Sequence, residues 1–205
     1  NNSKDKIFNF VSSWFVYGKD TPLPAKETSP CDPRGFYSIT KRAAEQLLIS
    51  YCETHEIKYR IFRLANVYGI GDKKASKKKN ALQYMIEEIA NNRDVNLYEG
   101  GCHVRDFIYV DDVCRAINLC IEKSKPNQII NIGTGIPTSI LDAMSHVKQS
   151  LNSASKFKTI DTPKFHKLVQ VENMYLDVNK LNSLNFKPLY GIKEGLDKIL
   201  KDYKS

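Results

Sequence analysis

The sequence of 205 residues is long enough for one or two small domains with a sizeable buried core. Hydrophobic residues make up 41% and charged residues 26%, which is the composition of a globular protein and excludes disordered, collagen-like and disulfide-scaffold chains. The net charge of +8 suggests nucleic-acid binding, but five lysines within residues 73–79 carry most of the excess, and no nucleic-acid-binding motif accompanies them. We interpret them as a solvated loop, with a loop that attracts anionic small molecules as the alternative.

Hydropathy, cysteines and histidines narrow the class further. No apolar run approaches the roughly 18 residues of a membrane span, and residues 1–6 lack the pattern of a signal peptide. The cysteines are odd in number and none forms a CxxC pair, which favours reduced thiols in a cytoplasmic protein. The four histidines lack metal-ligand spacing, so we expect no metal site. Cys114 and Cys120 lie within a helical pattern and are expected to be buried.

The first 64 residues predict a strand, a long helix and a second strand. Residues 7–17 are rich in β-branched and aromatic residues, which predicts a buried strand, and four prolines within residues 18–36 predict a loop. An amphipathic pattern predicts a helix over residues 37–55, and residues 57–64 predict the next strand. A βαβ unit of this kind joins parallel strands.

The rest of the chain continues the alternation with shorter elements. Helices are predicted over residues 80–91, 111–122, 138–151, 177–184 and 191–203, and strands over residues 95–98, 107–110 and 129–132. No internal repeat is present. We therefore predict an α/β protein whose last third forms a smaller lobe.

Tyr37 and Lys41 are a candidate catalytic pair. Residues four apart on a helix share a face, so the Lys41 ammonium can approach the Tyr37 phenol. A phenol is a poor base near neutrality, but a neighbouring cation favours the phenolate and makes tyrosine a usable general acid–base. An exposed helix pair without a catalytic role is the alternative.

Two hydroxyl side chains, Ser12 and Ser13, lie in the first predicted strand. Ligands bind at the carboxyl ends of the strands in an open parallel sheet. A serine there can hydrogen-bond a substrate oxygen while a tyrosine on the next helix moves the proton. Serines that only cap the strand are the alternative.

Four motifs in order carry a resemblance to a known family. They are Ser12-Ser13-x-x-Val16-Tyr17-Gly18, Tyr37-x-x-x-Lys41, Arg63-Leu64-Ala65-Asn66-Val67-Tyr68-Gly69 and Arg105-Asp106-Phe107-Ile108-Tyr109-Val110-Asp111-Asp112-Val113. Their order and spacing resemble the extended short-chain dehydrogenase/reductases, specifically the NAD-dependent epimerase/dehydratase group that acts on nucleotide sugars. The resemblance extends over essentially the whole chain.

The resemblance implies three catalytic roles. Tyr37 would be the acid–base residue, and Lys41 would favour its phenolate and hold the nicotinamide ribose, so that both also contact the cofactor. Ser13 would be the catalytic serine and would hold a substrate oxygen. The implied cofactor is NAD, with NADP as the alternative.

The resemblance also implies residues for a nucleotide-sugar substrate. Asn66 and Arg105 would contact its diphosphate region, where the planar donor fork of an arginine suits the anionic oxygens. Asn80 would be a further substrate-binding asparagine. The alternatives are a turn residue for Asn66 and an ion pair with Asp106 or Asp111 for Arg105.

Several positions depart from the family pattern. The 4,6-dehydratases of the family have Asp-Glu after the catalytic threonine, whereas Trp14 and Phe15 stand here and can act as neither acid nor base. This disfavours a dehydratase. Residues 100–102 are Gly-Gly-Cys in place of Gly-Asp-Gly, and Gln170 stands where a second arginine is expected. The Gly-x-x-Gly-x-x-Gly turn that opens the family's dinucleotide-binding fold does not occur in the sequence, so we expect the N-terminal glycine-rich part to be missing.

The expected fold is the C-terminal part of a Rossmann-type parallel sheet with a smaller α/β substrate-binding lobe. Residues 1–66 and 105–132 would form the partial NAD(P)-binding domain, and residues 67–104 and 133–205 the nucleotide-sugar lobe. The complete protein would epimerise a nucleotide sugar, at C4, as a cytoplasmic homodimer, whereas this chain alone would be inactive. The alternatives are a nucleotide-sugar reductase or dehydrogenase and a non-catalytic dinucleotide-binding or sugar-sensing protein; we expect no nucleic-acid or membrane partner.

Overall fold

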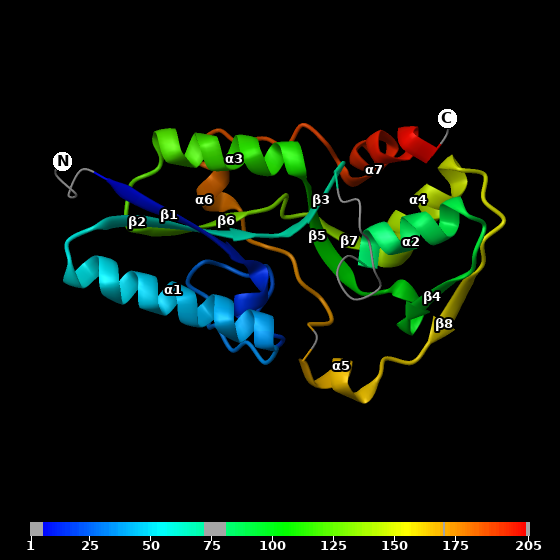
Figure 1. Cartoon of the computed structure of the whole chain (residues 1–205), viewed down its shortest axis with the longest axis horizontal. Coiled ribbons are helices and arrows are strands. Elements are labelled where there is room, and N and C mark those ends of the chain that lie inside the picture. The colour runs from blue at the N-terminus through cyan, green and yellow to red at the C-terminus, as the bar shows by residue number, and fades with distance from the viewer. Residues whose placement is uncertain (1–5, 72–80, 170, 204–205) are drawn as a thin grey trace.

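The computed structural model describes residues 6–71, 81–169 and 171–203 and has two lobes side by side (Figure 1). Its strands are β1 (Ile7–Ser13), β2 (Lys58–Leu64), β3 (Asn66–Tyr68), β4 (Val95–Tyr98), β5 (Val104–Tyr109), β6 (Gln128–Ile132), β7 (Pro137–Ser139) and β8 (Phe157–Ile160). Its α-helices are α1 (Phe36–Thr54), α2 (Ala81–Ala90), α3 (Val110–Lys123), α4 (Ile140–Ser150), α5 (Lys164–Val169), α6 (Asn179–Asn182) and α7 (Ile192–Leu200). Short 3₁₀ helices are η2 (Trp14–Tyr17), η3 (Glu99–Gly101) and η4 (Lys201–Tyr203).

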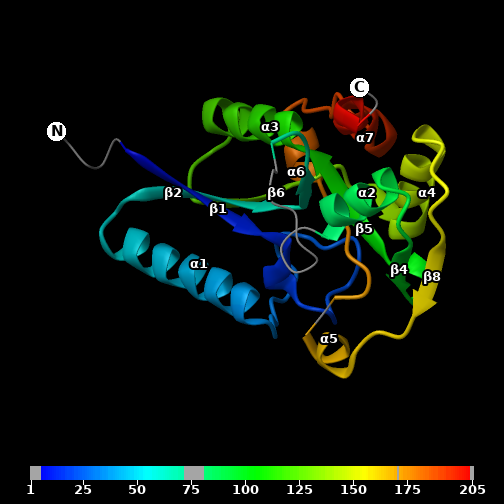
Figure 2. The ribbon, with the colours of Figure 1, turned by 45° about the vertical axis from the view of Figure 1, so that its right-hand side comes forward.

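The first lobe is built on a parallel sheet with the strand order β1-β2-β6. Helix α1 covers one face of this sheet, and α3 and α6 cover the other (Figure 2). Ser13 is in register with Leu64, and Leu64 with Ile132, so the three strands end at one edge. The predicted βαβ unit is thereby confirmed, and its carboxyl edge is the one that bears the candidate serine.

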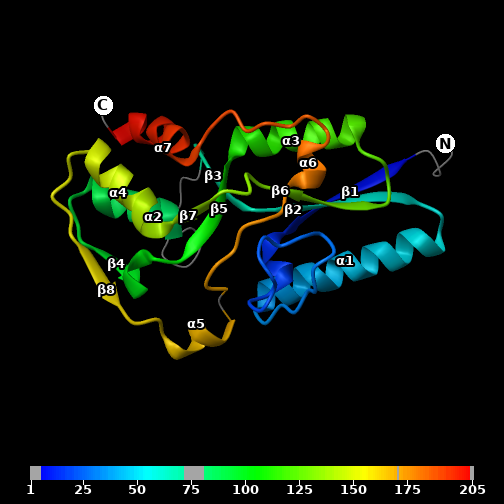
Figure 3. The same cartoon turned by 180° about the vertical axis from the view of Figure 1, so that it is seen from behind.

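The second lobe holds two smaller sheets. Strand β5 pairs parallel with β3 and antiparallel with β7, while β4 pairs parallel with β8. Helices α2, α4 and α7 pack beside these strands, as the view from behind shows (Figure 3). The α/β prediction is confirmed.

Two hydrophobic clusters form the main cores, and β5 contributes to both. Ile108 belongs to the cluster around β2, β6 and α3, whereas Phe107 and Tyr109 belong to the cluster around α2, α4 and α7. The first cluster also takes in Leu176 and Phe186, from a segment that the expected division assigns to the substrate lobe. Alternation along one strand therefore joins the lobes, because successive side chains point to opposite faces.

Some elements differ from the predictions. The first strand ends at Ser13 rather than Tyr17, because the Ser13 hydroxyl accepts a hydrogen bond from the backbone N–H of Phe15 and starts η2. Strands β3, β7 and β8 and helix α5 were not predicted; they are short and lack a clear hydrophobic period. Cys120 is buried as expected, but Cys114 is exposed on the outer face of α3, and all five cysteines are free thiols.

Some predictions fall outside the described residues. They are the lysine loop at residues 73–79, the candidate ligand Asn80 and the departure at Gln170. Within the described ranges, no helix is both long and apolar enough to cross a membrane.

Candidate active site

The end of β1 places the candidate serine at the carboxyl edge of the sheet. Ser13 is buried and caps η2, which carries Trp14 and Phe15 and ends at Gly18. Gly18 has a φ of +79°, and a β-carbon there would lie 2.1 Å from the Asp32 carbonyl oxygen. Only glycine allows this close approach. The chain on both sides of η2 is therefore held firmly.

Helix α1 begins beside this edge and carries Tyr37 in its first turn. The Ser38 hydroxyl accepts a hydrogen bond from the Gly35 N–H at 3.1 Å and donates one to the Gly35 carbonyl at 2.8 Å, which fixes the helix start. The Tyr37 side chain is 56% exposed. Lys41 lies one turn further and donates a hydrogen bond from Nζ to the Val11 carbonyl of β1 at 3.0 Å. Lys41 thus ties α1 to the strand that ends in Ser13.

Arg105 is a cation without a carboxylate partner among the described residues. Its guanidinium donates to the backbone carbonyls of Val104, Glu172 and Val171. Desolvation lowers the pKa of Arg105 to about 10, so the side chain still carries its charge at neutral pH. A half-buried, unpaired guanidinium is suited to bind an anion.

The two acids proposed as ion-pair partners of Arg105 have other partners. The Asp106 carboxylate accepts hydrogen bonds from the Thr134 N–H and hydroxyl and from the N–H groups of Gly135 and Leu176. Burial raises the pKa of Asp106 against these hydrogen bonds. Asp111 accepts a hydrogen bond from Lys198. The ion-pair interpretation of Arg105 is therefore not what the structure shows.

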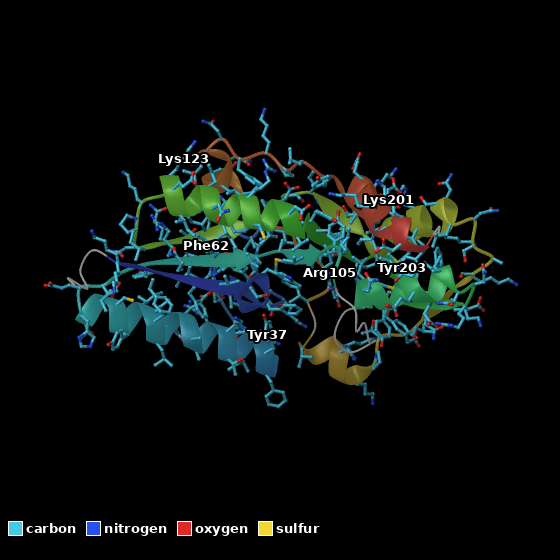
Figure 4. All side chains as sticks on the ribbon, turned by 45° about the horizontal axis from the view of Figure 1, so that its top comes forward. Tyr37, Phe62, Arg105, Lys123, Lys201 and Tyr203 are labelled. Carbon is cyan, nitrogen blue, oxygen red and sulfur yellow. The ribbon has the colours of Figure 1, made fainter. Side chains whose placement is uncertain are left out.

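Two aromatic rings connect Arg105 to Tyr37. The Arg105 guanidinium lies over the Trp14 ring at 5.6 Å, and Trp14 stacks on Phe15 with centroids 3.9 Å apart. The Phe15 and Tyr37 rings in turn form a T-shaped contact with centroids 6.0 Å apart. In Figure 4, Tyr37 lies at the N-terminal end of α1 and Arg105 lies between the lobes. We call the chain of contacts Arg105–Trp14–Phe15–Tyr37 the aromatic row, although its first member is a cation. In the sequence, Trp14 and Phe15 indicate only the loss of the dehydratase groups; because the predicted strand runs through them, their place after the end of β1 is apparent only in the structure.

Asn66 lies at the start of β3, next to the same edge. Its side-chain amide donates a hydrogen bond to the Asp106 carbonyl at 3.3 Å, which links it to the residue after Arg105. Asn66 is part of a strand rather than of a turn. The Gly133-Thr134-Gly135 turn wraps around the Asp106 carboxylate, and a β-carbon at Gly133 would lie 2.4 Å from Asp106 Oδ2. The turn thus serves to hold the Asp106 carboxylate.

A second arginine belongs to a buried network that the sequence analysis missed. Arg63 donates to both carboxylate oxygens of Glu45, at 3.0 and 2.7 Å, and lies over the Tyr17 ring at 4.7 Å. Burial alone would lower the pKa of Arg63, but the hydrogen bonds and charge of Glu45 raise it. The Tyr17 hydroxyl donates to Asn131 at 2.6 Å, and burial raises its pKa to about 12. No spacing in the sequence pairs Arg63, the penultimate residue of β2, with Glu45, which lies one turn after Lys41 on α1.

The structure thus brings Ser13, Tyr37, Lys41, Asn66 and Arg105 to one edge of the sheet, whereas Asn80 lies outside the described residues. Their catalytic and binding roles remain predictions. In the described part of the chain, no group of three or more His, Cys, Asp and Glu side chains could hold a metal ion. The arrangement offers one phenol, one serine hydroxyl, one ammonium and one unpaired guanidinium.

Residues 2–133 match the NAD dependent epimerase/dehydratase family. The chain is 32% identical over 202 residues to the Methanocaldococcus jannaschii protein named "Putative UDP-glucose 4-epimerase", covering 98% of this chain and 64% of that protein. The chain is 28% identical to human dTDP-D-glucose 4,6-dehydratase, with 96% of this chain and 56% of the relative covered.

A solved structure gives the same picture. The UDP-glucose 4-epimerase of Thermotoga maritima, solved with UDP-glucose, matches with a TM-score of 0.87 at 28% identity. The match covers 97% of this chain and 63% of that structure. The chain therefore spans less than two thirds of the length of these relatives.

Proposed function

The chain belongs to the NAD dependent epimerase/dehydratase family, and from that premise we propose that the full-length protein epimerises a nucleotide sugar at C4 with NAD as cofactor. One observation carries the choice of epimerase over dehydratase. Trp14 and Phe15 stand where the family's dehydratases have an acid and a base, and Phe15, on which Trp14 stacks, contacts Tyr37. Neither ring can transfer a proton, so the site is suited to oxidation and reduction without loss of water. The relatives named UDP-glucose 4-epimerase support the same choice.

The proposed mechanism assigns the proton transfers to Tyr37. As phenolate it takes the proton from the C4 hydroxyl of the sugar, while Ser13 holds the same oxygen by a hydrogen bond. NAD, held by Tyr37 and Lys41, would supply the hydride acceptor and donor for oxidation at C4 and for reduction from the opposite face. Tyr37 then returns the proton to the oxygen of the inverted centre. No net redox change results.

The proposed binding residues hold the two ends of the reaction. Arg105, whose charge has no carboxylate partner among the described residues, holds the diphosphate of the nucleotide sugar. Asn66 and Asn80 are proposed as further substrate ligands. Lys41 holds the nicotinamide ribose; its ammonium has three donors, of which one goes to the Val11 carbonyl. We propose residues 1–66 and 105–132 as the NAD side and residues 67–104 and 133–205 as the sugar side of a cytoplasmic homodimer.

The test is turnover of UDP-glucose by the full-length protein, wild type and Tyr37→Phe. We expect UDP-galactose to form in the wild type and kcat to fall by about 10²–10⁴-fold in Tyr37→Phe, because the phenol that moves the proton is lost. Tyr51→Phe, which removes a hydroxyl from an exposed tyrosine on the same helix, is the control and leaves kcat unchanged. Full turnover by Tyr37→Phe would contradict the assignment.

The same assay separates an epimerase from a reductase or dehydrogenase. An epimerase leaves the near-ultraviolet absorbance of NADH unchanged while the sugar is inverted, whereas a reductase consumes the cofactor in proportion to product. Stoichiometric NADH consumption would replace the proposal with the reductase alternative.

A further inference from the structure

The aromatic row begins in the core and ends at the surface. Trp14 is 3% exposed and packs in the first hydrophobic cluster with residues such as Met174 and Leu176. Phe15 is 36% exposed and Tyr37 56%. A ring that is packed on all sides keeps one orientation, whereas a half-exposed ring takes its orientation from its few neighbours. Trp14 is therefore the fixed member of the row.

The backbone that carries the two rings is also fixed. The Ser13 hydroxyl accepts the Phe15 N–H at the start of η2, and the Asp32 N–H donates to the Tyr17 carbonyl at 3.2 Å near its end. Gly18 lies too close to the Asp32 carbonyl to accept a side chain. The rings of Trp14 and Phe15 are thus presented from a short helix held at both ends.

Each outer member of the row depends on the ring beside it. Tyr37 lies in the first turn of α1, where a helix frays most readily, and its ring forms a T-shaped contact with the Phe15 ring. The Arg105 guanidinium lies on the Trp14 face, the ring type that attracts a cation most strongly. The inner pair thus stands between the proposed phosphate-binding cation and the proposed acid–base phenol.

We propose that Trp14 and Phe15 are positioning residues that hold Arg105 and Tyr37 at a set separation, so that a sugar diphosphate gripped at one end presents its reacting hydroxyl at the other. This inference rests on the proposed function for its kinetic consequence. Trp14 acts on binding through Arg105, and Phe15 acts on the chemical step through Tyr37. The two residues are thus expected to separate KM from kcat.

The kinetic test uses three variants of the full-length protein with UDP-glucose. Phe15→Leu removes the edge contact to Tyr37 and lowers kcat about tenfold with little change in KM, because a small misplacement of a reacting group is costly. Phe15→Tyr keeps an aromatic ring against Tyr37, so its kcat is expected to equal that of the wild type. Trp14→Phe keeps the stack but weakens the cation–π contact, which raises KM about threefold with kcat unchanged.

The matched control is Phe36→Leu. Phe36 is the residue before Tyr37 and is 86% exposed, so its substitution changes neither constant. A wild-type kcat in Phe15→Leu would overturn the inference. Equal losses of kcat in Phe15→Leu and Phe15→Tyr, together with a lower thermal midpoint in both, would also overturn it, since a general loss of packing would then be the cause.

A second test reads the row without turnover. Trp14 is the single tryptophan of the chain, so its fluorescence reports on this site alone. Titrating the 205-residue chain with UDP is expected to change the emission of Trp14 saturably, because a diphosphate bound by Arg105 places negative charge beside the cation that lies over the indole. Arg105→Met is expected to abolish the change, and Arg93→Met, which alters a surface arginine, to preserve it.

The two tests separate failure of the inference from failure of the proposed function. If the full-length protein turns over no nucleotide sugar but UDP changes Trp14 emission through Arg105, the epimerase proposal fails and the Trp14–Arg105 coupling stands. If turnover is normal and UDP leaves Trp14 emission unchanged, the coupling is wrong and the epimerase proposal stands.

Discussion

Arg63 and Arg105 each lie over an aromatic ring, yet they occupy opposite electrostatic situations. Arg63 is buried over Tyr17 and pairs with both oxygens of the buried Glu45 carboxylate. Arg105 is half-buried over Trp14 and donates only to backbone carbonyls among the described residues. The pKa of Arg63 is raised by its partner, whereas desolvation lowers that of Arg105.

This contrast shows which arginine is structural and which can bind an anion. A charge that is already neutralised by a bidentate carboxylate gains little from a further anion and loses much if its partner is removed. A desolvated cation that contacts carbonyl dipoles and a ring but no carboxylate can still form a strong Coulomb interaction with an anion. Residue type and ring contact are shared, so the carboxylate makes the difference.

The largest expected effect is a loss of stability when the carboxylate partner of Arg63 is removed. Glu45→Ala leaves a buried guanidinium without its counterion and is expected to lower the free energy of unfolding by about 3–5 kcal/mol. Urea denaturation of this chain measures it. Glu88→Ala removes the partner of the exposed Arg93 and is the control, with an expected loss below about 1 kcal/mol. Equal losses in the two variants would contradict the structural role of Arg63.

Replacing Arg105 is expected to affect stability less than replacing Glu45, and its main effect is on the affinity for UDP. Arg105→Met is expected to weaken UDP binding by about 10–100-fold, since charge-assisted hydrogen bonds to phosphate are lost. Its unfolding free energy is expected to fall by about 1–2 kcal/mol, less than in Glu45→Ala, because hydrogen bonds to three backbone carbonyls are lost but no buried carboxylate is left unpaired. Calorimetric titration and urea denaturation measure the two quantities. Unaltered UDP affinity would remove Arg105 from the binding site.

The smallest effect is a pH dependence that sharpens the comparison. Burial alone would raise the pKa of Glu45, but the hydrogen bonds and charge of Arg63 lower it below the ordinary value of about 4.3. Because the folded state then holds its proton less tightly, the pair stabilises the fold above that value and loses this contribution as the pH falls through the lowered pKa. The stability difference between wild type and Glu45→Gln is expected to be constant near neutrality and to shrink below pH ~4. A difference that stays the same down to pH ~3 would contradict it.

The sequence predicts the larger elements of the fold because their hydrophobic periods are long. Helix α1 and strand β2 begin or end within one residue of the expected positions. The first strand was extended too far, since the pattern of residues 14–17 resembles a strand and gives no sign that Ser13 caps a 3₁₀ turn. Strands β3, β7 and β8 have three or four residues each, too few for a period. Pairing across the sheet makes them strands, and pairing partners are not local information.

The sequence predicts which residues form the candidate site but not the contacts that their side chains make. The motifs located Ser13, Tyr37, Lys41, Asn66 and Arg105, and the parallel sheet brings these to one edge. The Lys41 bond to the Val11 carbonyl and the Trp14–Phe15 bridge depend on side-chain directions that no spacing encodes. Likewise, nothing in the sequence shows that, within the described ranges, Arg63 pairs with a carboxylate and Arg105 does not.

Strand β5 has a consequence for how this molecule unfolds. Ile108 is buried in one core, and its neighbours Phe107 and Tyr109 are buried in the other. Unfolding of either core would therefore expose one face of β5 to solvent. We therefore expect the two lobes to unfold as one cooperative unit, so that a mutation in either core lowers the melting temperature of both together. The edge that bears Tyr37 and the lobe that holds α2, α4 and α7 are therefore expected to share a single unfolding transition.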